Sequence, residues 1–154
     1  MSFEVEVRQY DDPVVQALVG AVQAEYVDRY GGPDEAAVEA GEFDRPRGMF
    51  LIGLLDGVAL ATGGWRWIEA GDTLTVECKR MFVLAVARRR GFARTILAEL
   101  EDTARRAGAR RIVLNTGQMQ PEAISLYESS GYARTAGFGH YACHAGAVFY
   151  AKGL

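Results

Sequence analysis

The stretch MFVLAVARRRGFART, residues 81–95, decides the fold of this chain. Apolar residues at its start suit the end of a buried strand, and a basic turn that contains Gly91 follows. From Phe92 to Ala104, apolar residues recur at every fourth position, which is the pattern of an amphipathic helix. We therefore expect a strand, a tight basic turn and a long helix.

An anion site is expected where this helix begins. The first turn of a helix has N–H groups without intrahelical partners and carries the positive end of the helix dipole. Gly91 and Ala93 leave the main chain open to close approach, and four arginines lie within seven residues. The spacing matches neither the P-loop nor the dinucleotide fingerprint. From these residues alone, a solvated basic turn is the alternative interpretation.

The neighbouring elements predict a mixed sheet. A strand, the long helix and a second strand form a β-α-β unit, which joins a parallel pair by a right-handed crossover. Upstream, Asp56-Gly57 between two apolar runs favours an antiparallel hairpin. We expect an α/β fold (α+β mixed) with six or seven strands and about four helices. The expected strands are 3–10, 49–55, 58–68, 74–84, 111–115, 132–138 and 147–152, and the expected helices are 13–30, a short one within 34–47, 92–107 and 121–130.

The composition predicts one soluble globular domain over residues 1–154. Of the 154 residues, 49% are hydrophobic and 24% are charged, as in ordinary soluble proteins. The apolar runs are shorter than the roughly 18 residues of a membrane helix, and the first residues lack a signal-peptide pattern. We therefore expect a cytoplasmic protein that makes no membrane contact. Cys78 and Cys143 are too few for a disulfide scaffold.

Charge is divided unevenly along the chain. Residues 1–76 carry 5 basic and 14 acidic side chains, a net charge of −9, whereas residues 77–154 carry 12 basic and 6 acidic ones, a net charge of +6. The basic half favours anionic partners and the acidic half favours cationic ones. Since the acidic half would repel the backbone phosphates, we expect no nucleic-acid partner. Solvated charged faces are the alternative interpretation.

Two motifs resemble those of a known family. Arg88-x-x-Gly91-x-Ala93, at the start of a helix, resembles the Q/R-x-x-G-x-G/A motif of the GNAT superfamily of acyl-CoA-dependent N-acyltransferases. The segment QPEAISLYESSGY, residues 120–132, is similar to the N-x-x-A-I-x-L-Y-x-x-x-G-F/Y segment of that family. Gln120 stands where the family has asparagine, and Ala85 where it often has proline.

The resemblance implies a GNAT fold with acetyl-CoA as cosubstrate and no metal. In this family the end of one parallel strand binds the pantetheine arm through its main chain, and the following turn holds the diphosphate. Asn115 and Gln120 would meet the cofactor from the other strand. The implied cofactor-binding residues are Met81, Phe82, Val83, Arg88, Arg89, Arg90, Gly91, Phe92, Ala93, Arg94, Thr95, Asn115 and Gln120.

Two residues are candidates for proton transfer. Tyr127 matches the family tyrosine near the thioester sulfur, and a phenol with a pKa of about 10 can return a proton to a leaving thiolate. Packing of an amphipathic helix is the alternative role for Tyr127. Glu77 would share a strand face with Val83 and matches a base that some members use. An ion pair with Lys79 on the same face is the alternative role for Glu77.

These patterns together predict an acetyl-CoA-dependent N-acetyltransferase that works by direct attack of an amine. Several acidic residues in the first half favour a small cationic acceptor: Glu25, Asp28, Asp34, Glu35, Glu39 and Asp44. A protein or peptide acetyltransferase for N-termini or lysines, and a CoA-binding module without catalysis, are the alternatives. We expect a monomer or homodimer. His140, Cys143 and His144 offer only three ligands in one short turn, so we expect no zinc.

Overall fold

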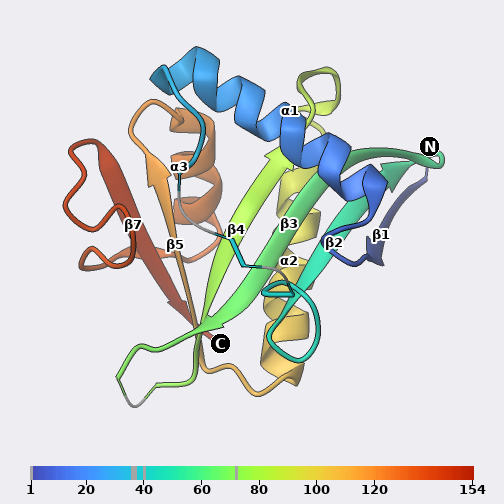
Figure 1. Cartoon of the computed structure of the whole chain (residues 1–154). Coiled ribbons are helices and arrows are strands. Elements are labelled where there is room, and N and C mark those ends of the chain that lie inside the picture. The colour runs from blue at the N-terminus through green and yellow to red at the C-terminus, as the bar shows by residue number, and fades with distance from the viewer. Residues whose placement is uncertain (1, 36–37, 40, 72) are drawn as a thin grey trace.

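Strands of the chain form one mixed sheet in the order β1-β2-β3-β4-β5-β7-β6 (Figure 1). The computed structural model describes residues 2–35, 38–39, 41–71 and 73–154. The strands are β1 (Phe3–Val7), β2 (Gly48–Leu55), β3 (Val58–Ile68), β4 (Thr75–Val83), β5 (Arg111–Gly117), β6 (Ala133–Arg134) and β7 (Ala147–Gly153). The helices are α1 (Pro13–Tyr30), α2 (Phe92–Arg106) and α3 (Pro121–Ser129), with a 3₁₀ turn η1 (Ala85–Ala87).

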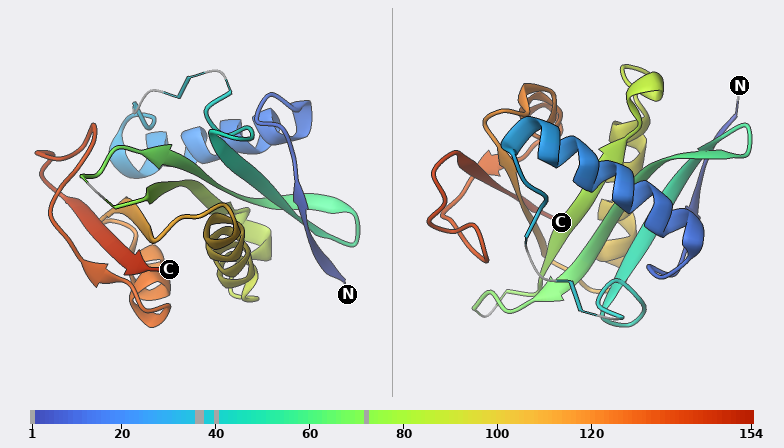
Figure 2. Two further views of the ribbon diagram at one scale, coloured as in Figure 1. Left: turned by 90° about the horizontal axis from the view of Figure 1, so that it is seen from below. Right: turned by 45° about the horizontal axis from the view of Figure 1, so that its top comes forward.

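The helices cover both faces of the sheet. Figure 2 shows α1 on one face, with α2 and α3 on the other. Val15, Leu18 and Val22 of α1 are buried at helical spacing, and the first two pack on Phe50 of β2. The larger core lies on the opposite face, where residues of α2, among them Leu100, are fully buried against the sheet. No helix in the described part of the chain is long and apolar enough to span a bilayer.

Helix α1 begins and ends where its sequence predicts. The Asp12 carboxylate accepts a 2.8 Å hydrogen bond from the Val14 amide, and Pro13 occupies the first helical position. Gly31 ends the helix with φ of +78°, a left-handed conformation that glycine adopts without steric cost. These caps hold the chain so that the segment after α1 crosses towards the ends of β4 and β5.

The parallel strands β4 and β5 separate part of the way along. Their register runs only from Thr75 opposite Arg111 to Glu77 opposite Val113. Beyond that point β4 continues beside β3, and β5 continues beside β7. The main chain of β4 after Glu77 therefore has no strand partner on its β5 side, and the sheet opens between the two strands (Figure 1).

A bulge in β4 changes the face of the sheet to which its later side chains point. Arg80 has φ of +60°, and the register with β3 shifts between Thr62 and Gly64. The Thr62 hydroxyl fixes the bulge with a 2.7 Å hydrogen bond to the Arg80 carbonyl. The bulge breaks the alternation that would have put Glu77 and Val83 on one face: Val83 packs in the α2 core.

The architecture confirms the expected mixed α/β fold, with seven strands and three α-helices in the described residues. The expected short helix within 34–47 is not found in the described residues of that segment, since residues 36, 37 and 40 lie outside them. Turns from Glu39 to Gly48 bury Phe43 under α1 instead. The strand expected over 132–138 is reduced to Ala133–Arg134. Asp34 binds Lys79 and Arg80, and Phe138, next to Gly137, packs on Phe149. Local sequence patterns do not encode such contacts.

Candidate active site

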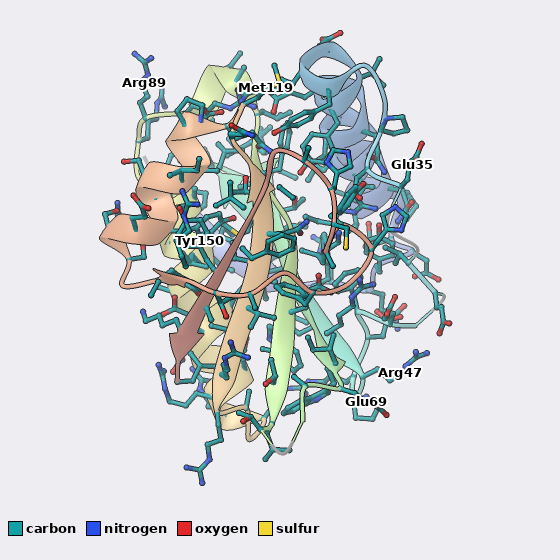
Figure 3. All side chains as sticks on the ribbon, turned by 90° about the vertical axis from the view of Figure 1, so that its left-hand side faces the viewer. Glu35, Arg47, Glu69, Arg89, Met119 and Tyr150 are labelled. Atoms are coloured by element: carbon teal, nitrogen blue, oxygen red, sulfur yellow. The ribbon has the colours of Figure 1, made fainter. Side chains whose placement is uncertain are left out.

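A cavity of about 830 Å³ lies where β4 and β5 separate. Five segments line it: the end of α1 with the following loop, the middle of β4, the chain from β5 into α3, α3 itself, and the loop before β7. Figure 3 shows Met119 and Glu35 on either side of this region, with the loop before β7 passing between them. The cavity therefore depends on residues from the whole chain.

Tyr127 contributes its phenol to the cavity from α3. Its side chain is 5% exposed, and its ring packs on Tyr132 and Tyr150 at centroid distances of 5.7 and 6.2 Å. Burial raises the pKa of Tyr127 well above its ordinary value. The phenol therefore stays protonated at neutral pH and can donate a hydrogen bond into the cavity.

Cys78 shows what the same environment does to a thiol. It is buried on β4 and also lines the cavity, and burial raises the pKa of its thiol. Both the Cys78 thiol and the Tyr127 phenol therefore stay protonated at neutral pH, because burial raises the pKa of each.

A charged cluster forms one wall of the cavity. Lys79 Nζ and Arg80 Nη1 each lie 3.0 Å from the same carboxylate oxygen of Asp34, and Tyr141 donates a 2.8 Å hydrogen bond to the other oxygen. The Tyr141 hydroxyl also accepts a 2.8 Å hydrogen bond from the Glu35 amide. These contacts fasten the loop before β7 to the segment after α1.

Glu77 lies outside the large cavity. Its carboxylate is 3.0 Å from both Nε and Nη2 of Arg66, whose Nη1 is 2.8 Å from Glu42. Glu77 lines an adjacent cavity of about 200 Å³, which shares Asn115 and part of the loop before β7 with the large one. The alternative role of Glu77, an ion pair with Lys79, is not observed, since Lys79 binds Asp34 and Glu77 binds Arg66.

The basic turn between β4 and α2 has one inward-facing arginine. Arg88 donates from Nε to the Val83 carbonyl at 2.8 Å, pairs with Glu25, and lies over the Phe82 ring at 5.4 Å. These contacts leave Arg88 as a support of the turn rather than as a projecting cation.

The rest of the turn faces outward. Arg89 is exposed with φ of +65°, and Figure 3 shows it projecting at the same end of the molecule as Met119. Gly91, with φ of +81°, precedes the first turn of α2, where the amides have no intrahelical acceptors. Arg94 contacts Ser129 and Ser130 beyond α3. The positive helix end and the exposed side chains remain available to an anion.

The structure distributes the expected residues over three places. The large cavity brings together Met81, Asn115, Gln120 and Tyr127. The basic turn and the start of α2 hold Arg88, Arg89, Arg90, Gly91, Phe92, Ala93, Arg94 and Thr95. Phe82 and Val83 end β4 between these two places, whereas Glu77 faces the small cavity.

Several cavity residues were not among the sequence candidates. Tyr26, whose pKa is raised to about 12 by burial, comes from α1. Lys79 and Arg80 form the charged wall together with Asp34, which the sequence named only as one of several acidic residues that favour a cationic acceptor. Tyr141 lies in the turn that contains His140, Cys143 and His144. A signal existed for the pair Lys79-Arg80, since two cations in succession are unusual inside a buried strand. Among the residues that the structure describes, no group suited to a metal ion occurs.

Comparison with known proteins assigns the family. The chain matches the acetyltransferase (GNAT) family over residues 16–132. It is 32% identical over 136 residues to the IAA acetyltransferase of Azospirillum brasilense, with 85% of this chain and 86% of the relative covered. The chain therefore belongs to the GNAT family, and its homologues indicate an acetyl-CoA-dependent N-acyltransferase.

Solved structures agree with this assignment. A candidate acyl-CoA N-acyltransferase from Klebsiella pneumoniae superposes with a TM-score of 0.78 at 26% identity and covers 99% of this chain and 97% of its own. The PaiA N-acetyltransferase of Thermoplasma acidophilum, solved in complex with coenzyme A, has a TM-score of 0.74 at 14% identity, with both chains fully covered. The second likeness is one of fold alone.

Proposed function

We propose that the chain binds acetyl-CoA across the opening between β4 and β5 and transfers the acetyl group directly to the amine of a small molecule. The cosubstrate supplies the acyl group as an activated thioester. The observation that carries the proposal is the early end of the β4–β5 pairing at Glu77, which leaves β4 unpaired beside a cavity that contains Tyr127.

The residues present fit this cosubstrate at both of its ends. The main chain of Met81, Phe82 and Val83 has no strand partner on its β5 side, so it can offer hydrogen-bonding groups to the amide-bearing pantetheine arm. The start of α2 offers free amides and the positive helix end to a diphosphate, and Arg89 adds an exposed charge. Asn115 and Gln120 line the cavity from the β5 side.

Proton transfer follows from the balance of the reaction. The attacking amine forms a C–N bond and loses a proton, and the C–S bond breaks and releases a thiolate that gains one. Tyr127 is protonated at neutral pH because burial raises its pKa, so it donates to the sulfur. The same hydroxyl is then reprotonated from solvent through the open end of the cavity.

The proton of the amine has a route towards Glu77. The small cavity that Glu77 lines shares Asn115, His140 and Tyr141 with the large one, so waters placed there would connect the carboxylate to the acceptor. The Glu77 carboxylate is bound to Arg66 and lies outside the large cavity. We therefore propose a relay through water rather than direct abstraction by Glu77.

The closed side of the cavity favours a small acceptor over a protein chain. Tyr141 joins the loop before β7 to Asp34 and Glu35, so an extended peptide has no open groove there. The acidic residues that favoured a cationic acceptor are partly neutralised inside the chain: Glu25 pairs with Arg88, Glu39 with Arg47, and Asp34 with two cations.

Two measurements test the proposal. Calorimetry should detect coenzyme A binding, and acetyl-CoA with a library of small amines should release free thiol. Binding without thiol release for any amine or peptide would instead support a CoA-binding module. Thiol release with peptides but with no small amine would support the protein acetyltransferase. Absence of coenzyme A binding would reject the proposal altogether.

A further inference from the structure

Arg80 brings to the cavity a charge that acetyl transfer alone does not need. Its side chain is 4% exposed, and in the described part of the chain its guanidinium binds only Asp34, through Nη1. The buried Nε has no hydrogen-bond partner there. A buried donor of a charged group that lacks an acceptor is costly, so this atom marks a place where a ligand acceptor fits.

The cluster around Arg80 also has a surplus of positive charge. Lys79 and Arg80 share the single carboxylate of Asp34, which also accepts a hydrogen bond from the neutral Tyr141. The other cation of the cavity wall, Arg29, is paired with Glu122 at 2.6 Å. One cation of the cluster thus lacks a directly paired carboxylate of its own, because the nearby Glu77 is bound to Arg66, and a singly charged anion would supply one.

The free edge of the guanidinium suits a carboxylate. Nε and Nη2 of an arginine lie along one edge and present two parallel N–H donors, the geometry that a carboxylate accepts with both oxygens. Asp34 binds Nη1 and holds the side chain in place, and in the described residues it leaves Nε and Nη2 without a hydrogen-bond acceptor. The β4 bulge brings the side chains of Lys79 and Arg80 together at Asp34, in the cavity that Tyr127 also lines.

We infer that the acetyl acceptor is an amino acid, or a close derivative, whose carboxylate binds to the Nε and Nη2 edge of Arg80. This inference rests on the proposed acetyl transfer and names its substrate class. The amine of an α-amino acid is attached to the carbon next to the carboxyl group, so the bound carboxylate holds the amine close to Met81 and Tyr127, the neighbouring cavity residues. Asp34 acts as a positioning residue for Arg80.

The test compares matched acceptors and matched variants. The standard amino acids, their α-carboxamides and the corresponding decarboxylated amines are assayed by thiol release. Each acid that reacts should have a kcat/KM roughly 10- to 100-fold higher than its amide, the range for hydrogen bonds to charged groups. Arg80→Lys keeps the positive charge but removes the two parallel N–H donors. It should abolish most of the difference in kcat/KM between acid and amide, mainly through a higher KM for the acid. Arg105→Lys, on the exposed face of α2, is the control.

Binding provides a readout that is independent of turnover. Calorimetry on the enzyme saturated with coenzyme A should show that the acids bind, that their amides bind at least about tenfold more weakly, and that Arg80→Lys loses this preference. Binding of acids without any turnover would support the carboxylate site and reject the acetyl transfer. Equal turnover of acids and amides in the wild type, or an unchanged preference in a folded Arg80→Lys variant, would overturn the carboxylate site and leave the acetyl transfer standing.

Discussion

The side chain of Arg88 donates a 2.8 Å hydrogen bond from Nε to the main-chain carbonyl of Val83. The first arginine of the basic turn is thus bound to the strand that precedes the turn, and its other contacts, to Glu25 and the Phe82 ring, also lie within the protein. Arg89, next in sequence, is exposed. The two arginines therefore have different roles: Arg88 stabilises the turn, and the exposed charge of Arg89 can bind an anion.

Arg89→Ala and Arg88→Ala should separate these roles. We expect Arg89→Ala to weaken coenzyme A binding about 3- to 10-fold at low salt, less at high salt, with little change in stability. Arg88→Ala should weaken binding and also lower the free energy of unfolding by about 1–2 kcal/mol, since the turn loses its support. Calorimetry and urea denaturation measure both. Arg105→Ala removes the same charge at the other end of α2 and should change neither coenzyme A binding nor stability. Equal effects of the three substitutions on binding would argue against an anion site at the turn.

Tyr127→Phe keeps the packed ring and removes only the hydroxyl. We expect kcat for acetyl transfer to fall roughly 100-fold, because the thiolate loses its proton donor, while coenzyme A affinity stays within about twofold. The matched control is Tyr132→Phe, which removes the 2.8 Å hydrogen bond to Glu101 next to the same ring contact. It should lower stability by about 1–2 kcal/mol and leave kcat unchanged. Unchanged kcat in Tyr127→Phe would remove this residue from the mechanism.

Buried tyrosines predict a loss of stability at alkaline pH. Burial raises the pKa of Tyr26 to about 12 and that of Tyr132 further, whereas an unfolded tyrosine titrates near 10. Below pH ~10 both states keep the proton; above it the unfolded state releases protons first. The free energy of unfolding should therefore fall between pH ~10 and ~12, by up to about 1.4 kcal/mol per pH unit for each such residue.

Urea denaturation at several pH values, with phenolate absorbance of the native protein, measures this effect. The Tyr26→Phe variant should show a shallower fall than the wild type, because one of the shifted phenols is gone. Titration of every tyrosine near pH 10 in a protein that is still folded would contradict the prediction.

Two glycines should respond to alanine in opposite directions. A Cβ atom on Gly63 of β3 would lie 2.7 Å from Ile96 and 2.8 Å from the sulfur of Met81, so Gly63→Ala should cost about 1–3 kcal/mol of stability. Gly20, on the exposed side of α1, has no atom within 4 Å of such a Cβ. Gly20→Ala should stabilise the protein by about 0.5–1 kcal/mol, since alanine favours helix. Urea denaturation of both variants checks the difference in sign.

Local patterns predicted the regular elements well. The caps of α1, the fourfold spacing of α2 and the Asp56-Gly57 hairpin depend on neighbours in sequence, and each element lies close to its expected bounds. The segment from Asp34 to Arg47 did not form the expected helix in its described part. Its conformation depends on contacts with residues about 45 positions away, Lys79 and Arg80, and these have no signature in the local pattern.

The same limit applies to the candidate site. The motifs pointed to Tyr127 and Gln120, which line the cavity, because a family pattern records positions that geometry brings together. The sequence did not predict the charged wall of Asp34, Lys79 and Arg80, because strict alternation along a strand would put Lys79 and Arg80 on opposite faces of β4. A bulge with φ of +60° at a non-glycine residue is a tertiary property, held by Thr62 on the adjacent strand.

The short register between β4 and β5 has a mechanical consequence. Only three residue pairs, from Thr75–Arg111 to Glu77–Val113, join the two parts of the sheet directly. A small rotation about these pairs moves the far tips of both strands much more than their beginnings. If acetyl-CoA binds in the opening as proposed, such a rotation would widen or narrow its site while the β3–β4 and β5–β7 ladders stay intact.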